Sequence, residues 1–166
     1  MKKTLWSIGT GTALAVWMAV IFLFSAQPSA ESSEISGSLS YRLVDEAAEV
    51  FHLKLSEWEI LKKAEFLEAP IRKAAHMTEY AILGMLFFAF LSSLGQKGPR
   101  RFWLSFVLAV CYAATDEIHQ LFVPGRSGQF LDVCIDAAGV AAGLLLLGIL
   151  LKIVRKRCAK RDIPLQ

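Results

Sequence analysis

Four long apolar segments dominate this sequence and limit what the chain can fold into. They lie at 5–24, 74–94, 102–123 and 131–151, and each has about the 20 residues that a helix needs to cross a bilayer. Hydrophobic residues make up 55% of the 166 residues, and the mean hydropathy is +0.47. Both values are high for a soluble domain. We therefore predict an all-α, polytopic membrane protein, a single domain over 1–166 with four transmembrane helices. We expect it to contact the lipid bilayer and not to bind nucleic acid.

The first apolar segment has two interpretations. Lys2 and Lys3 precede it and Ser29-Ala30 follows it, as in a cleavable signal peptide. The segment is longer than the roughly 7–15 apolar residues of a signal peptide. Pro28 also does not suit a cleavage site. We expect a retained membrane anchor.

Basic residues predict how these segments are oriented. If both termini are cytoplasmic, the cytoplasmic segments are the N-terminus, the turn before Phe102 and a basic tail over 152–166. These segments hold 11 of the 18 Lys and Arg residues but only one of the 15 Asp and Glu residues. Positive residues accumulate on the cytoplasmic side of membrane proteins, so we expect a multi-pass plasma-membrane protein with the segment 25–71 exported.

The exported segment has its own helical pattern. Its apolar residues recur at helical spacing at Leu39, Leu43, Ala47, Val50 and Phe51. A capping box, Ser56 with Glu59, predicts the start of a second short helix. We expect an amphipathic pair on the outer membrane face or over the bundle, with a receptor-binding loop as the alternative.

Polar residues gather near the exported ends of the later segments. Only the 14 residues from Phe102 to Thr115 are uncharged before Asp116, so the polar group that follows falls in the outer half of the bilayer. Ionisable groups there normally face a partner or a wet cavity. In the fourth segment Gly139 and Gly143 form a GxxxG pair, which predicts the close approach of another helix.

We predict that these polar residues form one outward-facing site. The candidate ligand-binding residues are Arg72, Lys73, Tyr80, Gln120, Arg126, Asp132 and Asp136. The candidate catalytic residues are His76, Glu79, Asp116, Glu117 and His119. Arginine and lysine suit a phosphate or carboxylate. His76 with Glu79, and Asp116 with His119, have the spacing of acid/base pairs.

Other functions remain open for the same residues. His76, Glu79, Asp116, His119, Asp132 and Asp136 also have a spacing that suits a metal ion as cofactor. The charges are alternatively structural, as ion pairs that fix the register of the helices. A proton or ion pathway is disfavoured, because the inner halves of the four segments carry no ionisable residues.

Four motifs resemble those of the VanZ-like family, which is named for a protein associated with teicoplanin resistance. They are Phe-Ser-Ala-Gln (24–27), Arg-Lys-Ala-Ala-His-Met-Thr-Glu-Tyr (72–80), Thr-Asp-Glu-Ile-His-Gln-Leu-Phe-Val-Pro-Gly-Arg-Ser-Gly (115–128) and Asp-Val-Cys-Ile-Asp-Ala-Ala-Gly (132–139). A typical member has Phe at Met77 and Ser at Ala26.

The resemblance implies a multi-pass bacterial membrane protein of the cell envelope, linked to resistance against glycopeptide antibiotics. It implies no established reaction, so whether the chain is an enzyme stays open. A lipid-linked or cell-wall ligand would suit the site. The alternative is a non-enzymatic membrane protein that alters antibiotic access or envelope assembly.

Overall fold

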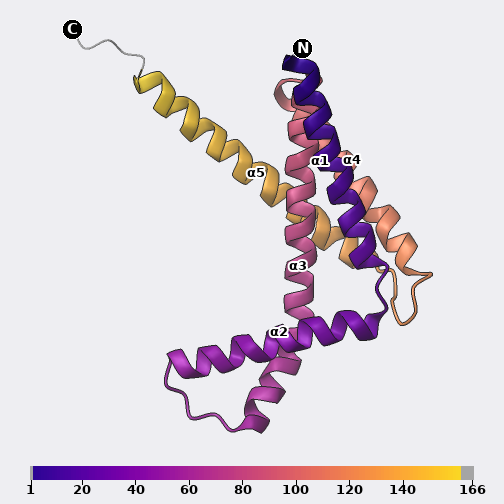
Figure 1. Ribbon diagram of the computed structural model, residues 1–166, viewed down its shortest axis with the longest axis vertical. Coiled ribbons are helices and arrows are strands. Elements are labelled where there is room, and N and C mark those ends of the chain that lie inside the picture. Colours follow the sequence, from indigo (N-terminus) through magenta and orange to yellow (C-terminus); the bar gives the residue numbers. More distant parts are fainter. Residues whose placement is uncertain (1, 162–166) are drawn as a thin grey trace.

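The computed structural model describes residues 2–161 and consists of five helices (Figure 1). They are α1 (Lys2–Ser25), α2 (Ser29–Val50), α3 (Glu57–Ser93), α4 (Gly98–Gln120) and α5 (Phe130–Arg161). No strand occurs among the described residues. The all-α prediction is therefore confirmed. The last residues of the predicted basic tail, 162–166, lie outside the described part of the chain.

Within residues 2–161, three helices, and not the expected four, are long and apolar enough to cross a membrane. They are α1, α3 and α5. The third predicted span, 102–123, corresponds to α4. This helix carries Arg100 and Arg101 in its first turn and ends at Gln120. Its uncharged stretch is too short because Asp116 and Glu117 follow in its last turns. Residues 121–123 form a turn after the helix.

The helix α3 unites two elements that the sequence analysis treats as separate. The predicted capping box is present, because the Ser56 side chain accepts a hydrogen bond from the Glu59 backbone and the Glu59 side chain bonds the Ser56 backbone. The helix that begins at this capping box is not short as expected, but is the first part of α3. It continues through Pro70 into the apolar segment 74–94. Proline removes one backbone hydrogen bond, and here the helix carries on past that loss.

α3 is the central helix of the bundle and packs against all four others. Its contact with α5 is the closest, because Gly139 and Gly143 of α5 lie directly against the backbone of Met77 and Ala81. A Cβ atom at either glycine would collide with a carbonyl oxygen of α3. The predicted role of the GxxxG pair is thus confirmed.

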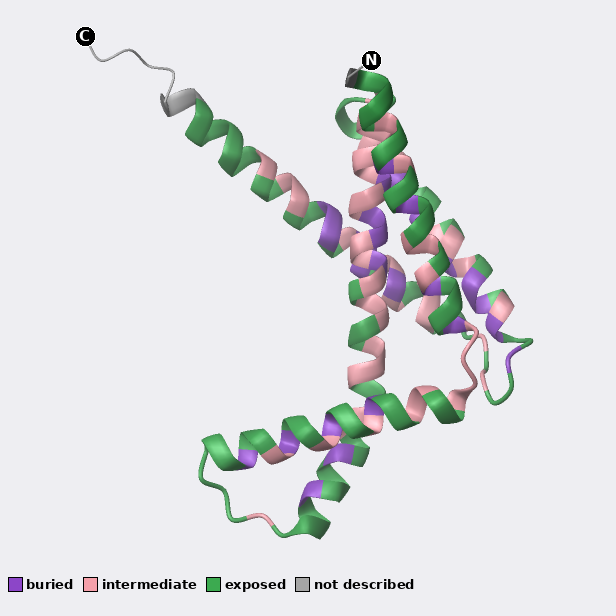
Figure 2. Cartoon of the chain, viewed as in Figure 1, coloured by how far each residue is buried: buried purple, intermediate pink, exposed green. Residues whose placement is uncertain are grey.

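The bundle core lies where the four long helices meet. Its buried residues include Ile21 of α1, Tyr80 and Leu83 of α3, Ala113 of α4 and Val140 of α5 (Figure 2). Many large apolar side chains point outward instead, such as those of α1 and α5. An outward apolar surface of this size suits contact with lipid.

α2 crosses α3 beyond one end of the bundle (Figure 1). Its buried stripe is Ser36, Ser40, Val44 and Ala48, and not the predicted stripe that begins at Leu39 and Leu43. Leu39 and Leu43 are each 46% exposed. The small serines allow the two helices to approach closely where they cross, and this leaves the leucines on the flanks of the contact.

Candidate functional site

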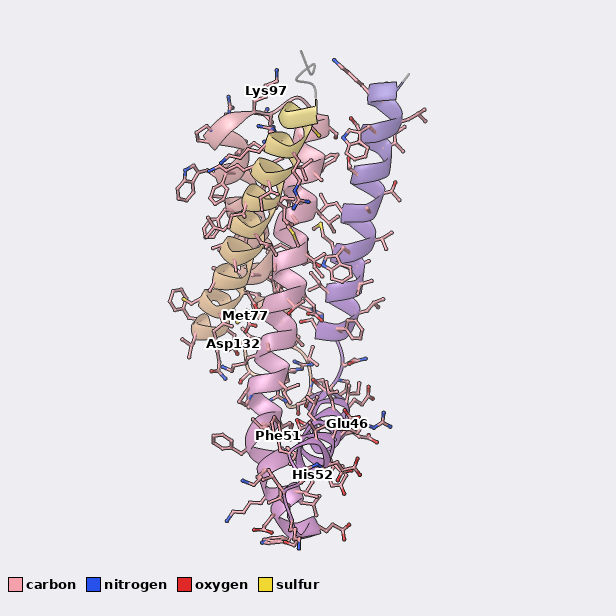
Figure 3. All side chains as sticks on the ribbon, turned by 90° about the vertical axis from the view of Figure 1, so that its left-hand side faces the viewer. Glu46, Phe51, His52, Met77, Lys97 and Asp132 are labelled. Carbon is pink, nitrogen blue, oxygen red and sulfur yellow. The ribbon has the colours of Figure 1, made fainter. Side chains whose placement is uncertain are left out.

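The polar residues lie at the end of the bundle nearest α2. In Figure 3, Met77 and Asp132 lie at this end and Lys97 lies at the opposite end. The last turns of α1 and α4, the middle of α3 and the first turns of α5 meet here. The antiparallel path of the chain brings together groups that are far apart in sequence, such as Gln27 and Arg126, which are 99 residues apart.

A buried hydrogen-bond network joins α1 to α4. The Ser25 hydroxyl donates to Asp116 Oδ2 at 2.7 Å, and Gln120 Nε2 donates to Ser25 Oγ at 2.8 Å. All three side chains are buried. Asp116 Oδ1 and the hydroxyl of Tyr80 are also buried, and neither has a hydrogen-bond partner among the described residues. The network therefore holds Asp116 in place through Oδ2 and leaves Oδ1 available to accept a further hydrogen bond.

The sequence places Ser25 at the exported end of the first span, next to the predicted site, but neither Ser25 nor Gln129 is among the candidate catalytic or ligand-binding residues. Ser25 closes the first apolar segment, and its polarity within an apolar run is the signal that points to it. The backbone N–H of Gln129 donates to Glu117 Oε2 at 2.8 Å. Sequence patterns carry no signal for such a backbone donor.

Two cations of α3 are directed to different neighbours. Lys73 Nζ forms an ion pair with Asp132 Oδ1 of α5 at 2.8 Å. Arg72 Nη1 donates to Ser33 Oγ of α2 at 3.2 Å and lies 3.7 Å from Glu68 Oε1. Consecutive residues therefore connect α3 to both α5 and α2.

Arg126 closes the site from the turn between α4 and α5. Its Nε donates to the Gln27 carbonyl oxygen at 3.1 Å, beyond the end of α1. Gly125 precedes it with φ at +73°, a conformation that favours glycine. Partial burial, followed by repulsion from Arg72, lowers the pKa of Arg126, while nearby carboxylates such as Asp116 oppose this effect. The guanidinium nevertheless stays charged, because arginine titrates far above neutral pH.

The two predicted acid/base pairs differ in the structure. His76 Nδ1 lies 3.6 Å from Glu79 Oε2, which is within ion-pair range but too long for a hydrogen bond. Asp116 is bonded to Ser25 and Gln120 and not to His119. The His119 ring instead packs on Phe22 with 4.5 Å between ring centroids, and its Nε2 is buried without a partner in the described part of the chain.

A small cavity collects most of the predicted site. Its volume is about 120 Å³, enough for a few water molecules. The predicted residues that line it are Arg72, Lys73, His76, Glu117, Gln120, Arg126, Asp132 and Asp136. A second, more apolar cavity of about 170 Å³ shares Arg72, His76 and Arg126 and adds Glu79. We call the first cavity the polar chamber. Asp116 and Tyr80 lie in the bundle beside it, and His119 lies against α1.

The predicted metal ligands do not converge. Among residues 2–161, no group of three or more His, Cys, Asp or Glu side chains could hold a metal ion. Asp132 instead forms an ion pair with Lys73, and Asp116 accepts hydrogen bonds from Ser25 and Gln120.

Comparison with known proteins gives one result. No curated protein and no solved structure matches the chain. The model of one protein family, VanZ/LLP1, matches residues 11–152. This range contains all five helices at least in part, the polar chamber and the four motifs of the sequence analysis. The chain therefore belongs to the VanZ/LLP1 family.

Proposed function

We propose that this plasma-membrane protein binds the anionic group of a cell-envelope or lipid-linked ligand in its polar chamber, on the extracytoplasmic side. The observation that carries the proposal is that Arg72, Lys73 and Arg126 line one cavity of about 120 Å³, where Glu117, Asp132 and Asp136 also lie. Guanidinium and ammonium groups bind phosphates and carboxylates through charge-assisted hydrogen bonds. Charged groups are costly near a bilayer, so their gathering favours a functional cavity.

The proposed orientation places both termini in the cytoplasm. Its support is the excess of basic residues in the segments that would be cytoplasmic. The turn with Lys97 lies at the end of the bundle opposite Asp132 (Figure 3). In this proposal α4 is embedded in the membrane beside the three candidate spans. It packs on α1, α3 and α5, and its polar last turns face protein instead of lipid.

A catalytic form of the proposal uses the acid/base groups at the chamber. His76 at the chamber wall and Glu79 in the adjoining cavity would exchange a proton with the bound ligand, and Glu117 would accept one at the chamber wall. Asp116 and His119 would act from beside the chamber, since each has a buried atom without a partner in residues 2–161. Hydrolysis or group transfer on an envelope precursor would fit these roles.

The alternative function is structural. The Ser25–Asp116–Gln120 network joins α1 to α4, and the Lys73–Asp132 pair joins α3 to α5. These contacts alone would fix the helices, and the protein would then influence antibiotic access or envelope assembly without binding a ligand. Substitutions of Arg126 distinguish the two functions, because binding an anion requires the positive charge and the several N–H donors of its guanidinium group.

The proposal is tested by comparing cells that produce Arg126→Gln, Arg126→Lys or the unaltered protein at equal levels. The control is Arg100→Gln, an exposed arginine at the other end of the bundle. We expect Arg126→Gln to abolish any protein-dependent change in glycopeptide susceptibility and in the envelope lipids and precursors seen by mass spectrometry. Arg126→Lys should retain part of it. A new or missing species would identify a reaction, and resistance with an unchanged inventory would identify binding alone. If Arg126→Gln matches the unaltered protein, the binding proposal is wrong.

A further inference from the structure

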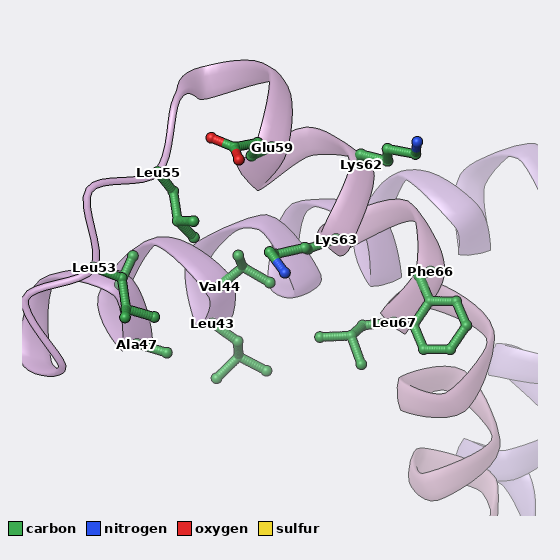
Figure 4. Close-up of a pocket in the computed structure, with 11 residues that line it drawn as sticks. Leu43, Val44, Ala47, Leu53, Leu55, Glu59, Lys62, Lys63, Phe66 and Leu67 are labelled. Carbon is green, nitrogen blue, oxygen red and sulfur yellow. The ribbon is translucent and has the colours of Figure 1, made fainter.

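A cavity larger than the polar chamber lies elsewhere in the described chain. It is an open groove of about 760 Å³ between the C-terminal half of α2 and the first turns of α3 (Figure 4). Leu43, Val44 and Ala47 line it from α2, and Phe66 and Leu67 line it from α3. The connecting segment closes one end with Leu53 and Leu55. We call this cavity the hairpin groove.

The packing of α2 explains why the groove is open. Ser36 and Ser40 form the contact at the crossing with α3, and Val44 packs on Ile60 beyond it. The larger side chains beside this stripe stay uncovered. Leu53 is 54% exposed and Phe66 is 79% exposed. Apolar surface of this extent, gathered in a concave site, is typical of a ligand-binding groove.

Two lysines, Lys62 and Lys63, lie at the groove. The only carboxylate that lines it, Glu59, is committed to the capping box, where its Oε2 accepts from the Ser56 backbone and hydroxyl at 2.8 Å. The rim therefore carries two ammonium groups and one carboxylate, a net charge of +1, beside an apolar wall. This combination complements a molecule that carries an apolar chain and an anionic head.

The position of the groove argues against the bilayer surface as its occupant. Ala74, where the apolar part of α3 begins, lies seven positions after Leu67, a rise of about 10 Å along the helix. In the proposed orientation the groove thus lies outside the bilayer. A second copy of the hairpin is also disfavoured, because it would bring the lysines of both copies together.

We infer that the hairpin groove binds one single-chain anionic amphiphile, with the acyl chain along the apolar wall and the anionic head beside Lys62 and Lys63. This site shares no lining residue with the polar chamber. The inference therefore does not depend on the proposed function of the chamber.

A photo-crosslinking experiment tests the inference on the full chain in nanodiscs of uncharged lipid. The probe is a dodecyl phosphate that carries a diazirine in its chain, with plain dodecyl phosphate as competitor. We expect saturable adducts within residues 43–67, identified by mass spectrometry. Leu53→Gln should weaken labelling about tenfold, because it removes apolar contact with the chain. Leu61→Gln is the control, since Leu61 is 49% exposed on the same hairpin but does not line the groove.

The charge requirement is tested with matched lysine variants. Lys63→Gln should weaken the phosphate probe several-fold and leave an uncharged dodecyl alcohol probe unchanged. Lys54→Gln, which does not line the groove, should change neither. Adducts confined to the membrane-spanning helices would overturn the inference, as would equal labelling of Leu53→Gln and Leu61→Gln. A dimer that Leu53→Gln dissociates would identify a second copy as the occupant and would also overturn it.

Discussion

The close contact between α3 and α5 predicts how Gly139→Ala changes the free energy of unfolding. Two opposing effects decide whether this substitution stabilises or destabilises the protein. Replacing a glycine by alanine inside a helix stabilises that helix by about 1 kcal/mol when the new methyl group meets nothing. At Gly139 the added Cβ would instead collide with backbone atoms of Met77, which cannot rotate away as a side chain could. Overpacking of this kind costs about 1–3 kcal/mol. We therefore expect Gly139→Ala to lower the free energy of unfolding.

Gly148 supplies a matched control on the same helix. A Cβ atom added there would have no neighbour within 4 Å. Gly148→Ala should therefore raise the free energy of unfolding by up to about 1 kcal/mol. Both variants are compared by reversible unfolding in mixed detergent micelles. If Gly139→Ala proves as stable as Gly148→Ala, the α3–α5 contact described above does not exist in the protein.

Three further predictions concern polar contacts. Ser25→Ala leaves Asp116 without its shortest hydrogen bond and should cost about 1–3 kcal/mol of unfolding free energy; an unchanged stability would show that Asp116 is bonded elsewhere. A double-mutant cycle on Lys73 and Asp132 should give a coupling free energy of about 1 kcal/mol or less, because their side chains are 42% and 30% exposed. A larger coupling would show that water reaches this ion pair less than its exposure indicates. Ser56→Ala should cost about 0.5–2 kcal/mol and increase amide hydrogen exchange in the first turn of α3, and equal exchange would refute the cap.

Much of the fold follows from local patterns in the sequence. The capping box at Ser56 is a local arrangement of side chain and backbone, so it predicts the start of α3 correctly. Long uncharged runs are equally local and predict α1 and α5. Gly139 and Gly143 predict a close helix contact because their spacing alone puts them on one face, although the spacing does not say which helix approaches.

The orientation of α2 could not be predicted in this way. Apolar periodicity favours Leu39 and Leu43 as its buried face, but the structure buries Ser36 and Ser40. The distance between crossing helices decides this, and the bulk of the side chains at the crossing sets that distance. The continuation of α3 through Pro70 also depends on tertiary contacts, since proline by itself favours a helix end.

The gathering of the candidate residues could be predicted from the sequence, but most of their pairings could not. Helical spacing identifies the residues that share a face, and eight of the twelve candidates line one chamber. The partner of Asp116 is Ser25, which lies 91 residues away, and not His119 on the same helix. Such a pairing depends on how two helices pack, and no spacing within one helix encodes it.

The outward-facing chamber is tested most directly by labelling single cysteines in intact cells with a membrane-impermeant thiol reagent. The native Cys111, Cys134 and Cys158 are first replaced by serine. Cysteine is then introduced at Asp132, which lines the chamber, or at Lys97, in the turn at the opposite end. We expect the cysteine at position 132 to react in intact cells and the cysteine at position 97 to react only after permeabilisation. The reverse pattern, or reaction of both in intact cells, would contradict an extracytoplasmic chamber.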